Sequence, residues 1–292
     1  MTESVIADFV AAFNAENTRQ DGPTKGRVLL SQKRLVLAAN DESRATIPLS
    51  AVFDIVVGHV PSDLGDFFDA TVTIAFERNN NRYAAAIEAG EETIEKFSTV
   101  LFKAILNGTD MTVNHPARVG GRVTDQEFVP AKLSLKPKAV RFTRGDSPLV
   151  IRLSTITDFS RSNRDIAGSR RPVLQIRHMD SGQSTMTMAA TDSSRKMSIL
   201  GRYLRLEYSD LMADLEDIEI SNDEKQILVA IYSGAGSEGI SLPTIVDKNP
   251  QEVMMLLNRL QDADLVIDTG EGTRLTPKGQ VVVNNHLEDV ND

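Results

Sequence analysis

Residues 47–55 read Ile-Pro-Leu-Ser-Ala-Val-Phe-Asp-Ile, and residues 151–159 read Ile-Arg-Leu-Ser-Thr-Ile-Thr-Asp-Phe. The two stretches share an alternation of apolar and polar residues, a Leu-Ser pair and an aspartate. Their spacing is far longer than the roughly 20 to 50 residues of a solenoid repeat, which indicates a duplicated domain. The chain is therefore expected to contain one domain twice.

Similar patterns surround both stretches. Alternating apolar residues predict a hairpin before each one. These residues are Val28, Leu30, Leu35 and Leu37 in the first copy, and Leu133, Leu135, Val140 and Phe142 in the second. Later period-2 runs are broken at Asn79-Asn80-Asn81 and at Asp180-Ser181-Gly182, which are typical of hairpin turns. Helical spacing of apolar residues from Ile94 and from Met197 predicts a helix at the end of each copy.

Each copy is accordingly predicted to be a small antiparallel β-domain closed by one helix. This order of elements resembles the pleckstrin-homology (PH) superfold. PH-like domains bind lipids, phosphopeptides or proteins, so the resemblance names no function by itself. The expected fold class is α+β with several domains, and the length of 292 residues allows two or three of them.

The N-terminal residues predict a short amphipathic helix that packs on the first domain. The apolar residues on one face of this helix are Val5, Ile6, Phe9, Val10 and Phe13. Acidic Glu3 and Asp8 stand where a signal peptide needs basic residues, and no apolar run reaches the length of a membrane span. A cytoplasmic protein is therefore expected.

Residues after 220 follow the order of a winged-helix domain. Ser221 with Glu224, and Asn249 with Glu252, form capping boxes that open two helices. A short helix is expected between them at 241–246. A hairpin at 269–272 and a last helix after 276 complete the order of helix, helix, helix, strand, wing and strand. The winged helix raises DNA binding as a function to test.

The third helix of this tail argues against DNA binding. On a helical wheel Val253, Leu256, Leu257 and Leu260 point inward, while the outward positions are Gln251, Met255, Asn258 and Asp262. Recognition helices normally offer Arg, Lys, Asn or Gln to base edges. Residues 222–292 also hold 5 basic and 12 acidic residues, which repel a DNA duplex. An outward methionine among carboxylates suits a protein-docking face, unless it is a stray apolar surface residue.

Charge is unevenly distributed over the four expected segments. The N-terminal helix and first PH-like domain (1–117) hold 10 basic and 16 acidic residues. The second PH-like domain (118–205) holds 17 basic and 7 acidic residues. An acidic helical connector (206–220) and the winged-helix domain (221–292) together hold 5 basic and 18 acidic residues. The second domain carries a candidate basic surface in one expected loop, made of Arg161, Arg164, Arg170 and Arg171. This surface either meets a polyanion or membrane, or attracts the acidic tail.

A stripe of apolar residues links the second domain to the tail. Its members fall three or four residues apart and are Met197, Leu200, Leu204, Tyr208, Leu211, Leu215 and Ile218. Such spacing predicts a continuous helix, whose part from Leu204 to Ile218 is a candidate homodimer contact. The alternative is that its first half packs on its own β-domain and the rest is a solvated connector.

No catalytic, cofactor or metal site is expected. The chain has no cysteine, and its four histidines lack ligand spacing and are expected at surfaces or turns; they are His59, His115, His178 and His286. Glycines 234, 236 and 239 match a dinucleotide-binding pattern but follow a helix instead of a strand. Ser50 and Ser154 recur between the copies without a histidine nearby. The protein is therefore not expected to be an enzyme.

The whole chain resembles the archaeal chemotaxis adaptor family CheF. The resemblance rests on the layout, on Glu3-Ser-Val-Ile-Ala-Asp8-Phe9, and on the repeated segments that begin at Ile47 and Ile151. It implies a cytoplasmic adaptor between phosphorylated CheY, a response regulator, and the switch complex of the archaellum motor. It implies no nucleic acid partner, and contact with the membrane only through the motor.

The residues expected to contact CheY come from the helical wheel and its neighbours alone. They are Met254, Met255, Asn258, Arg259 and Asp262. Two alternatives stay open: a winged-helix transcription regulator, and a PH-like module that binds membrane surfaces.

Overall fold

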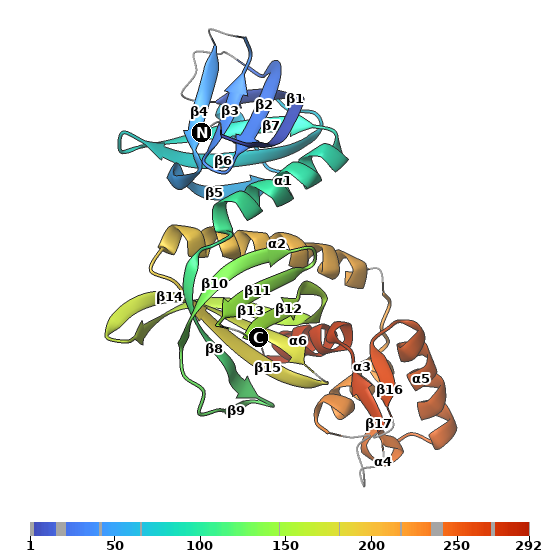
Figure 1. Cartoon of the computed structure of the whole chain (residues 1–292). Helices are drawn as coiled ribbons and strands as arrows, with labels where there is room; N and C mark the ends of the chain where they lie inside the picture. The colour runs from blue at the N-terminus through green and yellow to red at the C-terminus, as the bar shows by residue number, and fades with distance from the viewer. Residues whose placement is uncertain are drawn as a thin grey trace.

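The computed structural model describes residues 3–15, 22–40, 43–64, 66–145, 147–180, 182–216, 218–234, 242–269 and 272–291. It contains two antiparallel sheets, each followed by a long helix, and then a small helical part with a two-stranded ribbon (Figure 1). We call these the first β unit, the second β unit and the C-terminal unit. The α+β class expected from the sequence is confirmed.

The first β unit is a seven-stranded sheet in the order β4-β3-β2-β1-β7-β6-β5. Its strands are β1 (Val5–Ala15), β2 (Thr24–Ser31), β3 (Arg34–Ala38), β4 (Arg44–Pro48), β5 (Val52–Val57), β6 (Ala70–Arg78) and β7 (Asn81–Ala89). Helix α1 (Glu91–Leu106) follows and buries Ile94, Phe97 and Leu101.

The second β unit repeats this order as β12-β11-β10-β8-β15-β14-β13, with β9 paired to β8. Its strands are β8 (Asp110–Val119), β9 (Arg122–Val123), β10 (Val129–Lys136), β11 (Ala139–Arg144), β12 (Ser147–Arg152), β13 (Ile156–Ile166), β14 (Ser169–Asp180) and β15 (Gln183–Ala190). Helix α2 (Ser194–Glu216) follows. The division expected between residues 117 and 118 falls inside β8, because α1 ends earlier and β8 already pairs within the second sheet.

The duplication extends to irregular details. The stretch at 47–55 turns through a short 3-10 helix at Leu49–Ala51, and the stretch at 151–159 does so at Leu153–Thr155. A register shift lies between Val52 and Asp54 in one copy and between Ile156 and Asp158 in the other. Both expected hairpins also form, as β2–β3 and β10–β11.

The expected N-terminal helix is wrong, because residues 5–15 form strand β1 in the middle of the first sheet. This strand pairs with β2 along most of its length and with β7 near its end. Ala11, Phe13 and Ala15 alternate into the core, which is the period of a strand. β-branched and aromatic residues such as Val5 and Phe9 also favour strands. Five apolar residues of this segment matched a helical stripe by chance, and pairing with a strand on each side fixes the segment as a strand.

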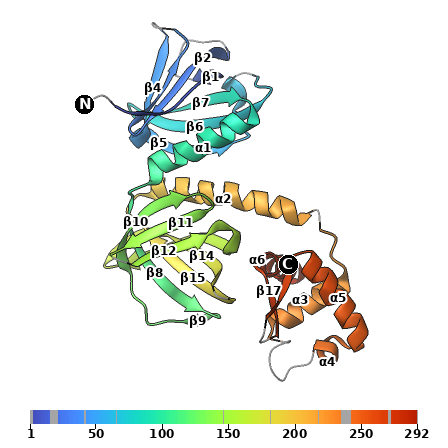
Figure 2. The ribbon, with the colours of Figure 1, turned by 45° about the vertical axis from the view of Figure 1, so that its right-hand side comes forward.

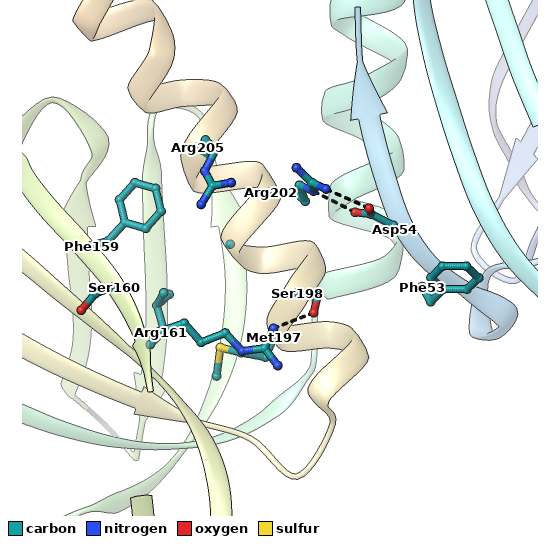
Figure 3. Close-up of a pocket in the computed structure, with 11 residues that line it drawn as sticks. Phe53, Asp54, Phe159, Ser160, Arg161, Met197, Ser198, Arg202 and Arg205 are labelled. Atoms are coloured by element: carbon teal, nitrogen blue, oxygen red, sulfur yellow. Dashed lines mark hydrogen bonds and ion pairs between the residues drawn. The ribbon is translucent and has the colours of Figure 1, made fainter. Parts of the chain in front are cut away.

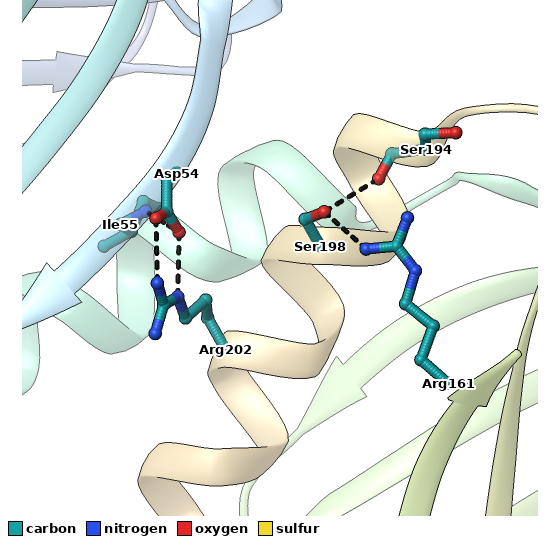
Figure 4. A network of polar contacts seen from close by, with 6 residues as sticks. All are labelled: Asp54, Ile55, Arg161, Ser194, Ser198 and Arg202. Atoms are coloured by element: carbon teal, nitrogen blue, oxygen red, sulfur yellow. Dashed lines mark hydrogen bonds and ion pairs between the residues drawn. The ribbon is translucent and has the colours of Figure 1, made fainter.

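The two β units share one hydrophobic core. A single cluster of buried side chains runs from Ala11 in β1 to Leu204 in α2. At the junction, helices α1 and α2 touch through Phe102 and Tyr203, whose ring centroids are 5.5 Å apart. Helix α2 also packs against β5, where Arg202 donates from Nε and Nη2 to the two carboxylate oxygens of Asp54, each at 3.0 Å (Figure 4). The two units are therefore held together by apolar and charged contacts.

The C-terminal unit packs beside the second sheet (Figure 2). Its elements are α3 (Asn222–Tyr232), α4 (Leu242–Val246), α5 (Pro250–Asp262), β16 (Val266–Thr269), β17 (Gly272–Leu275) and α6 (Pro277–Asn291). Helix α6 contacts β13, and Arg274 of β17 lies beside Gly182 in the β14–β15 turn. Both capping boxes expected from the sequence are present at the starts of α3 and α5. None of the helices in the described ranges combines the length and apolar character that a membrane span requires.

Glu224 is expected to contribute strongly to the stability of the C-terminal unit. Its side chain is buried, accepts from Ser221 N at 2.8 Å and Ser221 Oγ at 2.6 Å, and pairs with Arg259 Nε at 3.4 Å. We expect Glu224→Ala to lower the free energy of unfolding of this unit by about 2 kcal/mol, because a cap is lost and its donors are left unpaired. Hydrogen exchange of the α3 amides, followed at increasing urea concentration, measures this loss in the free energy of unfolding. Glu252 belongs to the second capping box and is exposed, so Glu252→Ala is the matched control and should lower the free energy of unfolding by less. Equal losses in the two variants would contradict the role that burial of Glu224 has in this prediction.

Candidate partner-binding site

The outer side of α5 carries the residues predicted to meet a partner. The predicted inward residues Val253, Leu256 and Leu260 are buried, which fixes the rotation of the helix. The exposed residues include Gln251, as expected from the wheel, and the four residues Met254, Met255, Asn258 and Asp262, which we call the α5 face. Met254 is 66% and Met255 56% exposed, so two adjacent thioether side chains lie in solvent. Methionine is flexible and polarisable, and it adapts to apolar pockets on other proteins.

Arg259 differs from the other four predicted contact residues. Its Nε atom pairs with Glu224 Oε1 at 3.4 Å, so it connects α5 to α3. Local patterns could not predict this pair, because the two residues belong to different helices. Arg259 therefore has a structural partner, and its charge is partly neutralised.

The surroundings of the α5 face are acidic. Lys248, just before the helix, pairs with Asp223 at 2.8 Å, and Arg259 pairs with Glu224. Both basic side chains nearest to α5 in the sequence thus have carboxylate partners. Exposed Asp262 adds a negative charge at the end of the helix. The combination of exposed methionines and negative charge suits a partner that offers apolar and basic side chains.

The four arginines of the candidate basic surface lie on two paired strands and not in a loop. Arg161 and Arg164 belong to β13, and Arg170 and Arg171 belong to β14. Arg164 stands opposite Arg171, and Asp165 stands opposite Arg170. Neighbouring residues of a strand point to opposite faces, so the four arginines divide between the two sides of the hairpin. Polar residues occupy both sides of the hairpin here, so the alternation of apolar and polar residues is weak. For this reason these residues were expected to form a loop.

Three of these arginines have partners within the chain. Arg161 donates to Ser198 Oγ at 2.7 Å, and Arg164 donates to Gln175 Oε1 at 3.3 Å. Arg171 forms an ion pair with Asp192 at 2.9 Å. The arginines are therefore integrated into the second β unit and do not form one continuous patch.

The helical stripe proposed as a dimer contact is largely used inside the chain. The continuous helix is confirmed as α2, which ends at Glu216, before Ile218. Leu204 is 1% exposed in the shared core, and Leu215 is buried in the core of the C-terminal unit, against which Ile218 packs. Tyr208 donates to Thr157 O at 3.2 Å. Of Leu211 the structure describes only the backbone. The described side chains of the stripe are thus covered by the chain's own residues, as the alternative interpretation expected for its first half.

A pocket between the two β units was not predicted from the sequence. It has a volume of about 420 Å³ and lies where β5, β13, β14 and α2 meet (Figure 3). Its polar wall includes Arg161, Arg202 and Arg205, and its apolar wall includes Phe53 and Phe159. These residues come from distant parts of the chain, so no local pattern could join them.

Two histidines that were expected at surfaces or turns form a pair in the second β unit. His115 Nδ1 lies 2.8 Å and His178 Nε2 lies 3.0 Å from the hydroxyl of Thr187, and the two rings stack with centroids 5.7 Å apart. Burial, with a contribution from the neighbouring His178, lowers the pKa of His115 to about 4. Burial also lowers the pKa of His178. Among the described residues no three His, Asp or Glu side chains group closely enough to hold a metal.

Comparison with known proteins gives one family and two similar full-length chains. The model of the family "Archaeal Chemotaxis signal transduction system protein F" matches residues 5–210. Taxis protein CheF2 of Halobacterium salinarum is 44% identical over 291 residues, which covers 100% of both chains. Taxis protein CheF1 of the same organism is 29% identical over 284 residues, with 95% of this chain and 94% of the relative covered. The family match stops before the C-terminal unit, whereas the alignment with CheF2 covers the whole chain.

Proposed function

The chain belongs to the family of archaeal chemotaxis signal transduction system protein F, and from this membership we propose that it is a non-enzymatic adaptor. It binds the phosphorylated response regulator CheY and links it to the switch complex of the archaellum motor. The observation that supports this role best is the α5 face, where two exposed methionines stand on an acidic unit. Such a surface fits protein recognition better than catalysis.

The proposal assigns the two β units to PH-like domains and the C-terminal unit to a winged helix. Each β unit is an antiparallel sheet closed by one helix, which supports the first assignment. Three helices followed by a two-stranded ribbon and a last helix support the second. In this arrangement the winged helix receives CheY, and the paired β units contact the motor.

Phosphorylation controls the adaptor through a difference in affinity. A receiver domain that offers lysines and apolar side chains on its signalling face complements the methionines and Asp262 of the α5 face. A ligand shifts an equilibrium only by its differential affinity for the two states. A few kcal/mol of preference for phosphorylated CheY are enough to change occupancy from low to high.

We expect the double substitution Met255→Lys, Asp262→Lys to weaken binding of phosphorylated CheY at least tenfold, about 1.4 kcal/mol. It replaces an apolar contact and an attractive charge with two charges that repel a basic partner. The measurement is isothermal titration of the full chain with CheY from the same source, with and without beryllofluoride as a phosphoryl mimic.

A matched control makes the same change in charge on the second β unit. Val150 and Asp165 are exposed there, and Val150→Lys, Asp165→Lys should leave the affinity for CheY unchanged. Equal loss in both double variants would mean that net charge, and not the α5 face, governs binding. Unchanged affinity in the α5 variant would reject this face. Specific binding of duplex DNA with a steep salt dependence would instead indicate a transcription regulator.

A further inference from the structure

The pocket between the β units has an excess of positive charge. Arg202 is neutralised by its two hydrogen bonds to Asp54. Among the described residues, Arg161 donates to one neutral partner, Ser198 Oγ. Arg205 is exposed and makes no hydrogen bond or ion pair with any residue in the described ranges. The pocket is thus lined by two guanidinium groups that pair with no carboxylate in the described part of the chain.

The rest of the lining contains apolar side chains together with Ser160 and Ser198. Phe53 of β5 comes from the first β unit, whereas Phe159 of β13 and Met197 of α2 come from the second. Figure 3 shows Arg161, Met197 and Phe159 on one side of α2, whereas Arg202 is directed towards Asp54 on the side that carries Phe53. A volume of about 420 Å³ lies within the usual range for small-molecule sites, which are often found where two units meet.

We propose that this pocket binds a phosphate monoester whose ester group is apolar. Two guanidinium groups match the double negative charge and three free oxygens of a phosphate monoester, and arginine binds phosphate through paired N–H donors. A carboxylate would compensate only one of the two charges. The partly exposed rings of Phe53 and Phe159 then cover the apolar part of the ligand. The ligand contacts both β units and reinforces their junction.

The test is isothermal titration of the full chain with phenyl phosphate at constant ionic strength, which holds non-specific screening fixed. We expect phenyl phosphate to bind more tightly than inorganic phosphate, because only the ester reaches the apolar wall. Arg161→Gln and Arg205→Gln are each expected to weaken binding about tenfold, because hydrogen bonds to a charged group are lost. Arg195 is exposed on α2, the helix that also carries Arg205. Arg195→Gln is therefore the control and should leave the affinity for phenyl phosphate unchanged.

Two outcomes would overturn the proposal. One is no binding of phenyl phosphate at about 10 mM, a concentration that would nearly saturate a site with a dissociation constant of about 1 mM. The other is an equal loss in the Arg195, Arg161 and Arg205 variants, which would indicate a general charge effect.

Binding to phosphatidic acid vesicles, absent with phosphatidylcholine and lost in Arg205→Gln, would identify a lipid as the source of the phosphate. Binding of phenyl phosphate without vesicle binding would identify a soluble ligand. CheY affinity is measured separately, so either proposal can fail alone.

Discussion

Replacing Gly279 by alanine is expected to unfold the C-terminal unit and abolish whatever that unit binds. A Cβ atom on this residue would lie 2.0 Å from the backbone oxygen of Leu265, a distance that backbone atoms cannot relieve by rotating. Gly279 N donates to Thr276 Oγ1, and Thr276 Oγ1 donates to Asp264 O, so the start of α6 is fixed against the start of β16. We expect a loss of about 3 kcal/mol or more in the free energy of unfolding, at or above the usual cost of overpacking.

Hydrogen exchange of amides in 221–291 measures this loss for the C-terminal unit alone. The matched control is Gly201→Ala in α2, where an added Cβ meets nothing within 4 Å. That change should stabilise α2 by up to about 1 kcal/mol, because alanine is a better helix former than glycine. If Gly279→Ala were as well tolerated as the control, α6 would have to start at a different distance from β16.

Acidification from pH 6.5 towards pH 4.5 is expected to destabilise the second β unit. The folded state lowers the pKa of His115 to about 4, below the ordinary value near 6.5 that applies when unfolded. As the pH falls, the unfolded state therefore takes up the proton first, and the free energy of unfolding decreases. The full effect is reached only below pH 4. Because His115 is partly exposed, we expect a loss of about 2 kcal/mol from this residue. Lowering of the pKa of His178 acts in the same direction.

Urea unfolding at several pH values between 7.5 and 4.5 measures the effect. The variant His115→Gln keeps a polar side chain near Thr187 but cannot titrate in this range, so its stability should vary less with pH. His59 is exposed and gives the control, because His59→Gln should retain the slope of the parent chain. Identical slopes for the parent chain and His115→Gln would contradict the assignment.

Short-range patterns predicted much of the fold. The repeated stretches at 47–55 and 151–159, the hairpins and both capping boxes depend on residues that are close in sequence. Strand β1 was missed because its apolar residues fit a helical stripe as well, and its identity depends on pairing with the distant strand β7. The ends of β13 and β14 that carry the four arginines were expected as a loop, because polar residues occupy both sides of these strands there.

In the candidate sites, too, local sequence patterns predicted some features and could not predict others. The outward direction of Met255 and Asp262 followed from the helical wheel, because buried leucines fix the rotation of α5. The pair between Arg259 and Glu224, the two histidines around Thr187, and the pocket at the junction all join distant segments. Arg202 and Asp54, for example, are 148 residues apart in the chain. Such contacts depend on the fold and leave no trace in local periodicity.

The order of the units also determines how the sheet edges are protected. Strands β5 and β13 occupy equivalent edges of the two sheets, and each packs against a helix of a later unit: β5 against α2, and β13 against α6. An uncovered edge strand offers free N–H and C=O groups to which another chain can add as a further strand. Each later helix thus lies against one edge strand of the unit before it. Removal of the last helix is therefore expected to leave β13 open to such pairing.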